Sequence, residues 1–488
     1  MFLSARILKK IIYLLGLLVA IVVVAQDKNA VKFAKTIKAE DLEAHLSIIA
    51  SDAYEGRETG KKGQKMAAKY IANHFESLGF EAPVEGSYFQ TFDLQESQLG
   101  SVYFRKGEDK MNGFQDFIYY SSAETHGEEY IKLIFANQES DVQRLRGAYV
   151  AFATQGLSGY QDFIESAMEA GAKGVFLILE NEDEFNSSMS RFSSYLQRPR
   201  LRLEGRDETS TKLLIGNKEL AAWIFDKSYD EIKEGDESIV IFNADYLDKP
   251  VPTENVLGYL KGSEKPEELL IITCHYDHVG IIDGEIHNGA DDDGSGTVTV
   301  LEIAEAFAEA TQKGKGPKRS ILFMAVTGEE KGLLGSRYYT DTDPVFPLAK
   351  TVANLNIDMV GRVDDAHKDQ SDYIYLIGSD KLSQDLHNLS ENVNQTFTKL
   401  NLDYTYNDEN DPNRFYYRSD HYNFAKNNIP IIFYFNGTHE DYHKPTDTVE
   451  KIDFETMEKR ARLVFHTGWE IANRDQRIVV DGMEREQN

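Results

Sequence analysis

Five short apolar segments in the second half of the chain are the feature that most constrains its fold. They cover residues 269–273, 321–326, 352–357, 373–377 and 429–435. The first is a continuous apolar run, which is typical of a strand buried on both faces of a sheet, and the other four are apolar strand candidates. A helix is expected between the first two, near residues 296–311, because apolar side chains recur on one of its faces. The pattern predicts an α/β domain whose functional residues lie where its strands end.

Histidine and carboxylate residues follow directly after the first three segments. His275 and Asp277 follow the first, Glu329 and Glu330 the second, and Asp358 the third. Each group alone has an ordinary alternative, since a His-x-Asp sequence or a pair of glutamates is common in surface turns. Two carboxylates at the end of a buried strand would nevertheless be costly without a cation or hydrogen-bond donors.

Three consecutive aspartates, Asp291, Asp292 and Asp293, form a further cluster between glycines. Their charges repel one another, so a divalent cation is expected to balance them unless all three point into water. An EF-hand calcium loop is excluded, because its alternate oxygen ligands and its distal glutamate are missing. With His443 near the C-terminus, the clusters offer two histidines and several carboxylates. That mixture suits zinc, cobalt or manganese, whereas calcium prefers oxygen ligands alone.

The N-terminus and the composition indicate an exported protein. Arg6, Lys9 and Lys10 precede an apolar run over residues 11–25, which suits a signal peptide and is short for a membrane span. We expect cleavage after Ala25, a periplasmic or secreted location and no stable membrane association; an uncleaved anchor helix is the alternative. The net charge of -28 argues against a nucleic-acid partner. Cys274 is the only cysteine, so intrachain disulfides cannot support the fold.

The first half of the chain divides into two regions. Residues 41–95 are predicted to be helical around a turn-rich segment at 55–60, and residues 101–245 to form a separate module. Within that module, strands at 149–153 and 174–179 flank a helix at 163–170, and chemically reactive residues are not clustered there. We therefore predict a signal peptide at 1–25, a discontinuous main domain at 26–100 and 246–478, an insert at 101–245 and a C-terminal tail at 479–488.

The motifs, in their order along the chain, resemble those of the co-catalytic di-zinc exopeptidases of metallopeptidase family twenty-eight. That family includes bacterial leucyl aminopeptidases, and glutamate carboxypeptidase and glutaminyl cyclase are relatives. The resemblance covers nearly all of the mature chain and is carried by EGRETG at 55–60, HYD at 275–277, GADDDGSG at 289–296, GEEKGLLGS at 328–336, NIDM at 356–359, SDH at 419–421, IP at 429–430, YH at 442–443 and TDT at 446–448.

The resemblance implies a fold as well as an activity. The main domain would be a three-layer, mixed-sheet zinc-exopeptidase domain of the phosphorylase/hydrolase-like type. Residues 101–245 resemble, more loosely, a smaller β-rich protease-associated domain, through LRGAYV at 145–150 and AMEAGAKG at 167–174. In the family such inserts usually cover the site and influence substrate access without supplying metal ligands.

The resemblance also assigns metal ligands residue by residue. His275 and Asp358 would hold one metal ion, Glu330 and His443 the other, and Asp291 would bridge the two. The expected cofactor is two Zn²⁺ ions, with Co²⁺ or Mn²⁺ as substitutes.

Other residues receive roles around these ligands. Glu329 would act as general base towards a metal-activated water, and Asp277 would orient the imidazole of His275. Three further residues are expected beside the substrate or behind the ligands, namely Tyr442, Arg418 and Asp420.

These assignments predict an exported metalloexopeptidase that hydrolyses peptide bonds near a chain terminus. An aminopeptidase is favoured, because that activity is the commoner one among bacterial relatives. A dipeptidase or carboxypeptidase, a glutaminyl cyclase, a non-enzymatic binding protein and a calcium-binding adhesion module are the alternatives. Asp408, Asp411, Arg414 and Arg418 offer both charges to a substrate terminus, so spacing does not choose between an amine and a carboxylate. The oligomeric state is not predicted.

Overall fold

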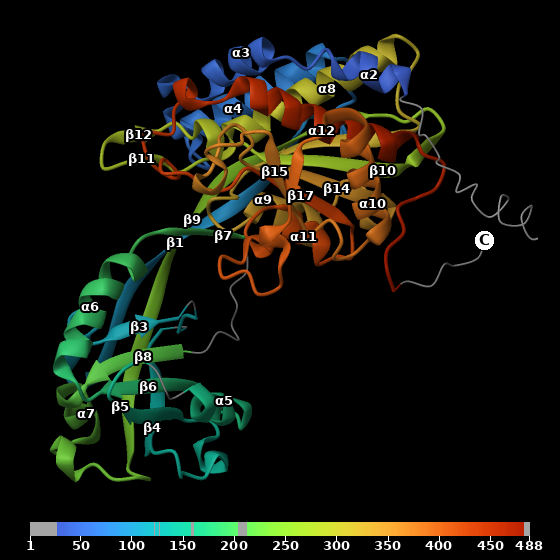
Figure 1. The fold of residues 1–488 in the computed structure, drawn as a ribbon. Coiled ribbons are helices and arrows are strands. Elements are labelled where there is room, and N and C mark those ends of the chain that lie inside the picture. Colours follow the sequence, from blue (N-terminus) through green and yellow to red (C-terminus); the bar gives the residue numbers. More distant parts are fainter. Residues whose placement is uncertain (1–26, 122, 126, 158–160, 204–211, 483–488) are drawn as a thin grey trace, which may run out of the picture. The chain divides into compact units, whose positions relative to one another are not determined.

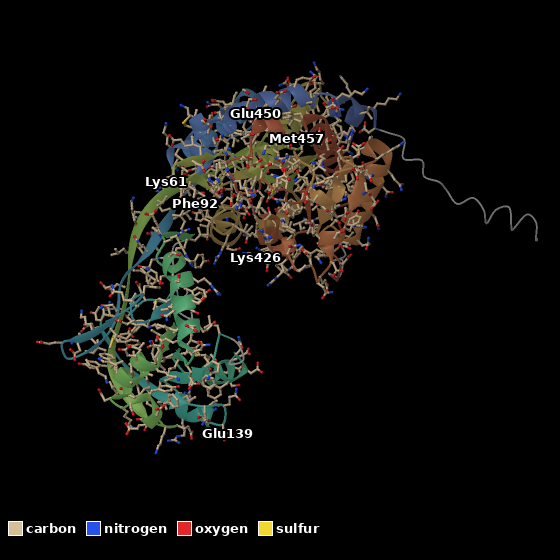
Figure 2. All side chains as sticks on the ribbon, turned by 60° about the vertical axis from the view of Figure 1, so that its left-hand side comes forward. Lys61, Phe92, Glu139, Lys426, Glu450 and Met457 are labelled. Carbon is tan, nitrogen blue, oxygen red and sulfur yellow. The ribbon has the colours of Figure 1, made fainter. Side chains whose placement is uncertain are left out.

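The structure is a computed structural model that describes residues 27–121, 123–125, 127–157, 161–203 and 212–482. The predicted signal peptide and the end of the predicted tail lie outside the described residues. The chain divides into two compact units: unit 1 comprises Met1–Thr91 with Thr253–Asn488, and unit 2 comprises Phe92–Pro252. Phe92, the first residue of unit 2, is labelled in Figure 2.

Unit 1 is built around a mixed sheet with the strand order β16-β15-β17-β14-β10-β13-β9. The pairs β10–β13, β10–β14, β14–β17 and β15–β16 are parallel, whereas β15–β17 and β13–β9 are antiparallel. The strands are β9 (Glu237–Leu260), β10 (Lys265–His275), β13 (Arg319–Val326), β14 (Thr351–Ile357), β15 (Tyr373–Ile377), β16 (Asn401–Asp403) and β17 (Ile431–Phe435).

Side chains of these strands alternate between two buried faces. Leu270 and Ile272 of β10 belong to a large core with six helices, whereas Leu269 and Ile271 belong to a smaller core. The larger core contains residues of α2 (Lys28–Ala34), α3 (Ala39–Ile49), α4 (Lys62–Ser77), α8 (Gly296–Gln312), α10 (Gln384–Val393) and α12 (Phe454–Asn473). The smaller core contains residues of α11 (His421–Ala425). Helices therefore cover both faces of the sheet in unit 1 (Figure 1), which confirms the predicted mixed, layered α/β architecture.

The register of the parallel strands brings the predicted site residues to one edge of this sheet. His275 at the end of β10 pairs with Val326 at the end of β13, and Thr273 pairs with Asn356 of β14. The residues that follow β13 and β14 are therefore close to His275.

The expectation that residues 41–95 are helical is wrong at its end, because β1 (Phe89–Lys106) begins there. An alternating pattern from Phe92 to Leu94 buries every second side chain of that strand.

The strands of unit 2 pair in the order β9-β4-β5-β6-β8-β3. The pairs β4–β5, β5–β6 and β6–β8 are parallel. Its strands and helices are β2 (Asp109–Asn112), β3 (Ile118–Tyr120), β4 (Glu129–Ala136), β5 (Tyr149–Thr154), β6 (Gly174–Leu179), β7 (Arg200–Leu203), β8 (Lys212–Asn217), α5 (Gln161–Glu169), α6 (Glu182–Leu196) and α7 (Lys218–Phe225). Its assignment as a protease-associated domain stays a prediction.

Two properties of the described residues bear on where the protein acts. Every helix in the described ranges is too short or too polar to span a membrane. The groups of histidines and carboxylates that could hold a metal ion all lie, among the described residues, in unit 1.

Candidate active site

The carboxyl ends of β10, β13 and β14 and the loops before α8 and α12 bring seven histidines and carboxylates together. We call this set the strand-end cluster: His275, His278, Asp292, Glu329, Glu330, Asp358 and His443. Two subsets have ligand atoms within 4.8 Å of one another, His275 with Glu329 and Asp358, and His278 with Asp292 and Glu330. Most of these side chains are buried, whereas that of His443 is 39% exposed. The arrangement provides two adjacent positions for a cation.

Asp292 lies between the two positions. Its Oδ1 is 3.3 Å from Nε2 of His275, and its Oδ2 is 3.0 Å from Nε2 of His443. The same His275 nitrogen is 3.6 Å from Oδ1 of Asp358, and the same His443 nitrogen is 3.1 Å from Oε2 of Glu330. Although burial opposes it, the contacts with His275 and His443 hold the pKa of Asp292 well below its ordinary value.

Asp291 does not occupy the bridging place predicted for it. Its Oδ1 accepts hydrogen bonds from Ser295 Oγ at 2.9 Å and from the Gly361 N–H at 2.7 Å. Its Oδ2 accepts one from Asn436 at 3.1 Å and is 3.2 Å from Nε2 of His439. Because protein donors already satisfy both oxygens, the carboxylate that faces His275 and His443 is the next one along the chain, and we correct the prediction to Asp292.

The third aspartate of the loop also has protein partners. Asp293 accepts hydrogen bonds from the N–H groups of Gly296, Met359 and His275, at 2.8, 3.0 and 3.2 Å. It therefore fixes the start of α8 to the ends of β10 and β14. The repulsion expected among the three adjacent aspartates is therefore relieved in two ways. The carboxylates of Asp291 and Asp293 accept hydrogen bonds from the protein, and only that of Asp292 faces the histidines of the cluster.

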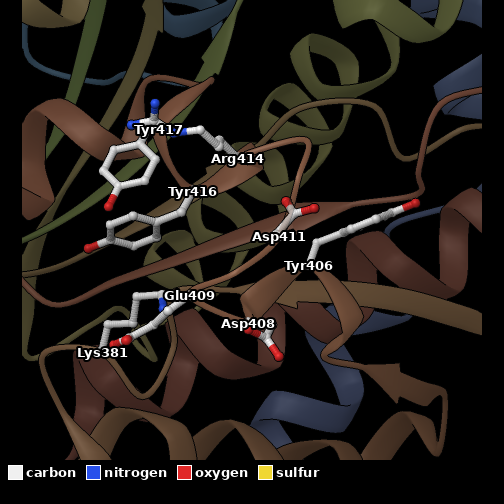
Figure 3. A pocket seen from close by; sticks show the side chains of 8 residues that line it. All are labelled: Lys381, Tyr406, Asp408, Glu409, Asp411, Arg414, Tyr416 and Tyr417. Carbon is white, nitrogen blue, oxygen red and sulfur yellow. The ribbon is translucent and has the colours of Figure 1, made fainter. Parts of the chain in front are cut away.

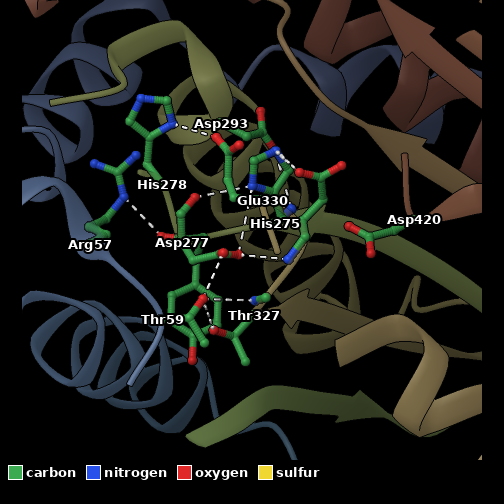
Figure 4. A network of polar contacts seen from close by, with 12 residues as sticks. Arg57, Thr59, His275, Asp277, His278, Asp293, Thr327, Glu330 and Asp420 are labelled. Atoms are coloured by element: carbon green, nitrogen blue, oxygen red, sulfur yellow. Dashed lines mark hydrogen bonds and ion pairs between the residues drawn. The ribbon is translucent and has the colours of Figure 1, made fainter. Parts of the chain in front are cut away.

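The backbone oxygen of Asp277, rather than its carboxylate as predicted, is the atom near the His275 ring. The Nδ1 atom of His275 is 3.1 Å from the backbone oxygen of Asp277 and 3.9 Å from its carboxylate. The carboxylate instead accepts hydrogen bonds from Thr59 Oγ1 at 2.8 Å and from the Glu329 N–H at 3.2 Å. Asp277 thus holds the His275 ring through its carbonyl and the Glu329 loop through its carboxylate (Figure 4).

Glu329 and Glu330 follow β13 and have different partners. Glu330 has Oε1 2.8 Å from Nδ1 of His278 and Oε2 3.1 Å from Nε2 of His443. Glu329 has its nearest described basic group 3.9 Å away, at Nε2 of His275. Burial raises the pKa of Glu329 well above its ordinary value, while His275 opposes the shift. Glu330 therefore lies among the histidines, in contact with two of them, whereas Glu329 lies beside them.

His443 combines an unusual backbone with stacking against its neighbour. Its φ of 57° lies in the left-handed region, which non-glycine residues seldom adopt and which occurs often at functional sites. Tyr442 stacks on the His443 ring at a centroid distance of 4.0 Å. Although burial opposes it, Asp292 and Glu330 raise the pKa of His443 to about 10. A metal ion bound here would displace that proton.

Sequence reasoning left out His278 and gave Arg57 no role of its own. His278 contacts Glu330, and its place three residues after His275 was a signal that we discounted, because five ligands already satisfied two ions. Arg57 is buried and donates to the backbone oxygens of Tyr276, Ile49, Asn288 and Gly289 at 2.7–2.9 Å. These bonds join the segment around Arg57 to α3 and to the loops at Tyr276 and at Asn288. Figure 4 shows Arg57 beside Asp277 and His278. The EGRETG motif contained this residue without revealing its contacts.

The buried polar atoms of the cluster fit a metal centre. Several make no hydrogen bond of good geometry in the described structure, although ion-pair contacts bring them together, namely Nε2 of His275, both ring nitrogens of His278, Oδ2 of Asp292 and Oε1 of Glu330. Buried groups of this kind normally have partners, so their convergence needs a ligand that the polypeptide does not supply. Imidazole and carboxylate donors in this mixture suit zinc.

A narrow pocket of about 30 Å³ opens onto the cluster. It is lined by Asp292, Glu329, Asp358, Met359, Phe415, Arg418, Phe433, Phe435, Thr438 and Tyr442. Tyr442 and Arg418 therefore line the same pocket as Asp292, Glu329 and Asp358, and their contact with a substrate stays a prediction. A larger pocket of about 420 Å³ is lined by Asp408, Asp411, Arg414 and their neighbours, without any member of the cluster (Figure 3).

Asp420 is buried and is not among the residues that line this pocket. Its Oδ1 accepts a hydrogen bond from Ser336 Oγ at 2.5 Å, and burial raises its pKa to about 7, with His275 opposing the shift. Its neighbour Ser419 donates at 2.6 Å to Oδ2 of Asp358. Support for the Asp358 carboxylate therefore comes from the residue before Asp420.

Comparisons with known proteins agree on one family. The family model described as Peptidase family M28 matches residues 255–468. A "Probable zinc metalloprotease" of Pyrenophora tritici-repentis is 39% identical over 119 residues, which is 23% of this chain and 23% of that protein. Aminopeptidase YwaD of Bacillus subtilis is 36% identical over 110 residues, 22% of each. The matches thus span less than a quarter of the curated relatives' lengths.

One solved structure is similar over almost the whole chain. It is an aminopeptidase from Aneurinibacillus sp. strain AM-1, with a TM-score of 0.50 and 18% sequence identity. The similarity covers 93% of this chain and 98% of that one. At this identity the likeness shows a shared fold.

Proposed function

Residues 255–468 form a domain of peptidase family M28, and from this premise we propose that the chain is a di-zinc exopeptidase, with aminopeptidase activity as its favoured form. The observation that carries the proposal is the position of Asp292. One of its oxygens contacts His275, which also contacts Asp358, and the other contacts His443, which also contacts Glu330. A carboxylate shared in this way fits two cations held side by side.

We assign the ligands accordingly. His275 and Asp358 would hold one zinc ion, Glu330 and His443 the other, and Asp292 would bridge them. His278 would hold Oε1 of Glu330, so that the other oxygen of this carboxylate faces His443. Partners of this kind orient metal ligands and are part of the affinity of a site. When bound, the ions would act as Lewis acids towards the scissile carbonyl and make water more acidic.

Glu329 is the proposed general base. It lies in the same pocket as Asp292 and Asp358, yet its contact to His275 is the longest of those that the cluster makes with that ring. The carboxylate is therefore left free to take a proton from the attacking water and to return it to the departing nitrogen. Asp277 holds the Glu329 backbone N–H, which fixes the start of this loop.

Tyr442 is the proposed donor to the substrate. It lines the pocket and stacks on His443, so its position is fixed relative to the ligands. Burial raises the pKa of Tyr442 far above that of a free phenol, with repulsion from the nearby carboxylates adding to the shift. The hydroxyl therefore keeps its proton at neutral pH and can donate a hydrogen bond to an oxygen that becomes negative during the reaction.

Two groups are candidates for the substrate terminus that the site holds, an amine and a carboxylate. The named aminopeptidases among the similar proteins favour an amine terminus. Arg418 in the pocket favours the second candidate, a carboxypeptidase or dipeptidase, because a guanidinium pairs with a carboxylate. A glutaminyl cyclase is disfavoured, because the cluster offers ligands for two ions.

Two further proposals concern the whole chain. We propose export after cleavage of residues 1–25, which N-terminal sequencing of the secreted or periplasmic protein would test. We also propose that unit 2 is a protease-associated insert that influences substrate access. Its described residues contribute to none of the candidate metal groups.

The direct test of function is a substrate panel assayed with and without a chelator. Aminoacyl-nitroanilides would be compared with N-blocked dipeptides, before and after removal of metal and after addition of zinc alone. We expect zinc-dependent release of nitroaniline. Preferential cleavage of the blocked dipeptides would replace the aminopeptidase with the carboxypeptidase. Hydrolysis that is unaffected by metal removal would contradict the metallopeptidase proposal itself.

A further inference from the structure

A second group of histidines and carboxylates lies on the helices of unit 1 and shares no residue with the strand-end cluster. We call it the helix cluster: His45 of α3, His74 of α4, and Glu302 and Glu305 of α8. One ligand atom from each of His45, His74 and Glu305 lies within 4.8 Å of the others. These three helices lie on the same side of the sheet of unit 1 (Figure 1). Four potential metal ligands from distant parts of the sequence thus converge.

Glu302 is a buried carboxylate beside the imidazole of His45. Its side chain is 1% exposed, and neither of its oxygens makes a hydrogen bond of good geometry with the described residues. Its Oε1 lies 3.8 Å from Nε2 of His45. Burial raises the pKa of Glu302 to about 8, with Glu305 and Asp41 adding to the shift and the backbone and charge of Lys38 opposing it. Such a group is stable only when a proton or a cation neutralises it.

His74 presents a lone pair to the cluster. Its ring donates a hydrogen bond to the backbone oxygen of Leu301, whereas its Nε2 is buried and has no partner. Burial lowers the pKa of His74 to about 4, so the ring is neutral near neutral pH. Because Nδ1 then carries the proton, Nε2 has only its lone pair, and it lies 3.6 Å from Oε1 of Glu305. A lone pair and a carboxylate oxygen repel each other unless a positive group lies between them.

His45 is held in the same manner. Its Nδ1 is 2.6 Å from the hydroxyl of Tyr70, which leaves Nε2 directed at Glu302. The ring of His45 meets that of His74 edge to face, with centroids 4.9 Å apart. Burial lowers the pKa of His45 as well, so this ring also favours the neutral form that binds metals. Imidazoles fixed through one nitrogen, with the other directed at carboxylates, are typical of metal sites.

We propose that the helix cluster binds one divalent transition-metal cation, of which zinc is the best example, through His45, His74 and Glu305. Glu302 supplies the buried negative charge beside it. Two imidazoles with carboxylate oxygens suit zinc, cobalt or nickel, whereas calcium and magnesium favour oxygen ligands. Glu305 is 43% exposed, so a cation can reach the site from solvent. The bound ion joins α3, α4 and α8, and it therefore stabilises the folded form of unit 1.

The test counts zinc in the full chain rather than following activity. Wild type, His74→Asn and a control, His387→Asn, are stripped with a chelator, reloaded with zinc alone and freed of excess metal before elemental analysis. His387 is a suitable control because it is a histidine of α10 whose ring contacts Ser379 Oγ, outside both clusters. We expect His74→Asn to bind about one zinc fewer per chain than wild type, and His387→Asn to match wild type. Zinc should also raise the Tm of the control more than that of His74→Asn.

Equal zinc content in wild type and His74→Asn would overturn the proposal, because the cluster would then be neutralised by protons. If His74→Asn does not fold, as judged by circular dichroism, Glu305→Gln gives the same readout at a partly exposed position. Unchanged zinc content in that variant also overturns the proposal. The outcome is separate from the proposed peptidase function, since neither residue belongs to the strand-end cluster.

Discussion

The strand-end cluster and the helix cluster contain the same types of side chain but are built in different ways. Around the first, backbone N–H groups and a hydroxyl hold the two aspartates on either side of Asp292, as in the five contacts that Asp291 and Asp293 accept from Ser295, Gly361, Gly296, Met359 and His275. In the second, helix faces place the groups, and neither oxygen of Glu302 makes a hydrogen bond of good geometry with the described residues. The comparison suggests that catalysis requires a preorganised site, whereas a stabilising metal site requires only convergence.

The largest expected effect separates the two neighbouring aspartates of the strand-end cluster. Asp292→Asn should remove both zinc ions of this cluster and lower kcat/KM by about 10³-fold or more, because one carboxylate serves both positions. Asp291→Asn should retain zinc and lose only about 10–100-fold, as expected for a group that supports the ligands. Elemental analysis and steady-state kinetics of both variants measure this. Loss of both ions from Asp291→Asn alone would restore the original assignment of the bridge.

The second prediction concerns proton transfer rather than metal binding. Glu329→Gln should lower kcat by about 10²–10⁴-fold, because the amide cannot take the proton of the attacking water. Its zinc content should match that of wild type, since Glu330 rather than Glu329 contacts His443. Kinetics beside elemental analysis would check both. Turnover at the wild-type rate would remove Glu329 from the role of base.

A third, smaller effect is expected at His278. His278→Asn removes the contact to Oε1 of Glu330 and should weaken zinc binding by about 10–100-fold, because orienting partners contribute that much to metal affinity. Competition with a zinc-binding dye would measure the affinity. A change in kcat at saturating zinc, with affinity unaltered, would instead give His278 a part in the reaction.

The smallest effect on catalysis is expected from the helix cluster. His45→Gln should change kcat/KM by less than about twofold while it reduces the zinc-dependent rise in Tm by a few degrees, about 2–4 °C for each kcal/mol of lost linkage. Differential scanning fluorimetry with and without added zinc would show the difference. A large loss of activity without a change in Tm would indicate that the two clusters are coupled. It would contradict the view that the helix cluster stabilises the fold without a part in catalysis.

The sequence predicted the sheet well because its strands are uniform. Buried strands such as Tyr373–Ile377 are unbroken apolar runs, so their bounds are readable. The start of β1 was missed because the helical prediction was extended to residue 95, whereas α4 ends at Ser77 and β1 begins at Phe89. β1 alternates between buried and exposed side chains near its start, and its residues belong to unit 1 up to Thr91 and to unit 2 from Phe92.

The site was predicted at the level of clusters but not of single atoms. The family resemblance placed His275, Glu330 and His443 together, yet it could not tell Asp291 from Asp292, since both belong to one motif. That choice depends on which aspartate meets donors such as the Gly361 N–H, a contact between residues 70 positions apart. The helix cluster was not found at all, because His45 and His74 belong to helical stripes that fit ordinary packing. Neither motif nor period links them to Glu302.

The most direct measurement is an anomalous difference map collected at the zinc absorption edge from crystals of the full chain. The account predicts two neighbouring peaks, one beside His275 and Asp358 and the other beside Glu330 and His443, with the carboxylate of Asp292 between them. A third peak is expected beside His45 and His74. A single peak, or two peaks bridged by Asp291, would contradict the proposed di-zinc centre.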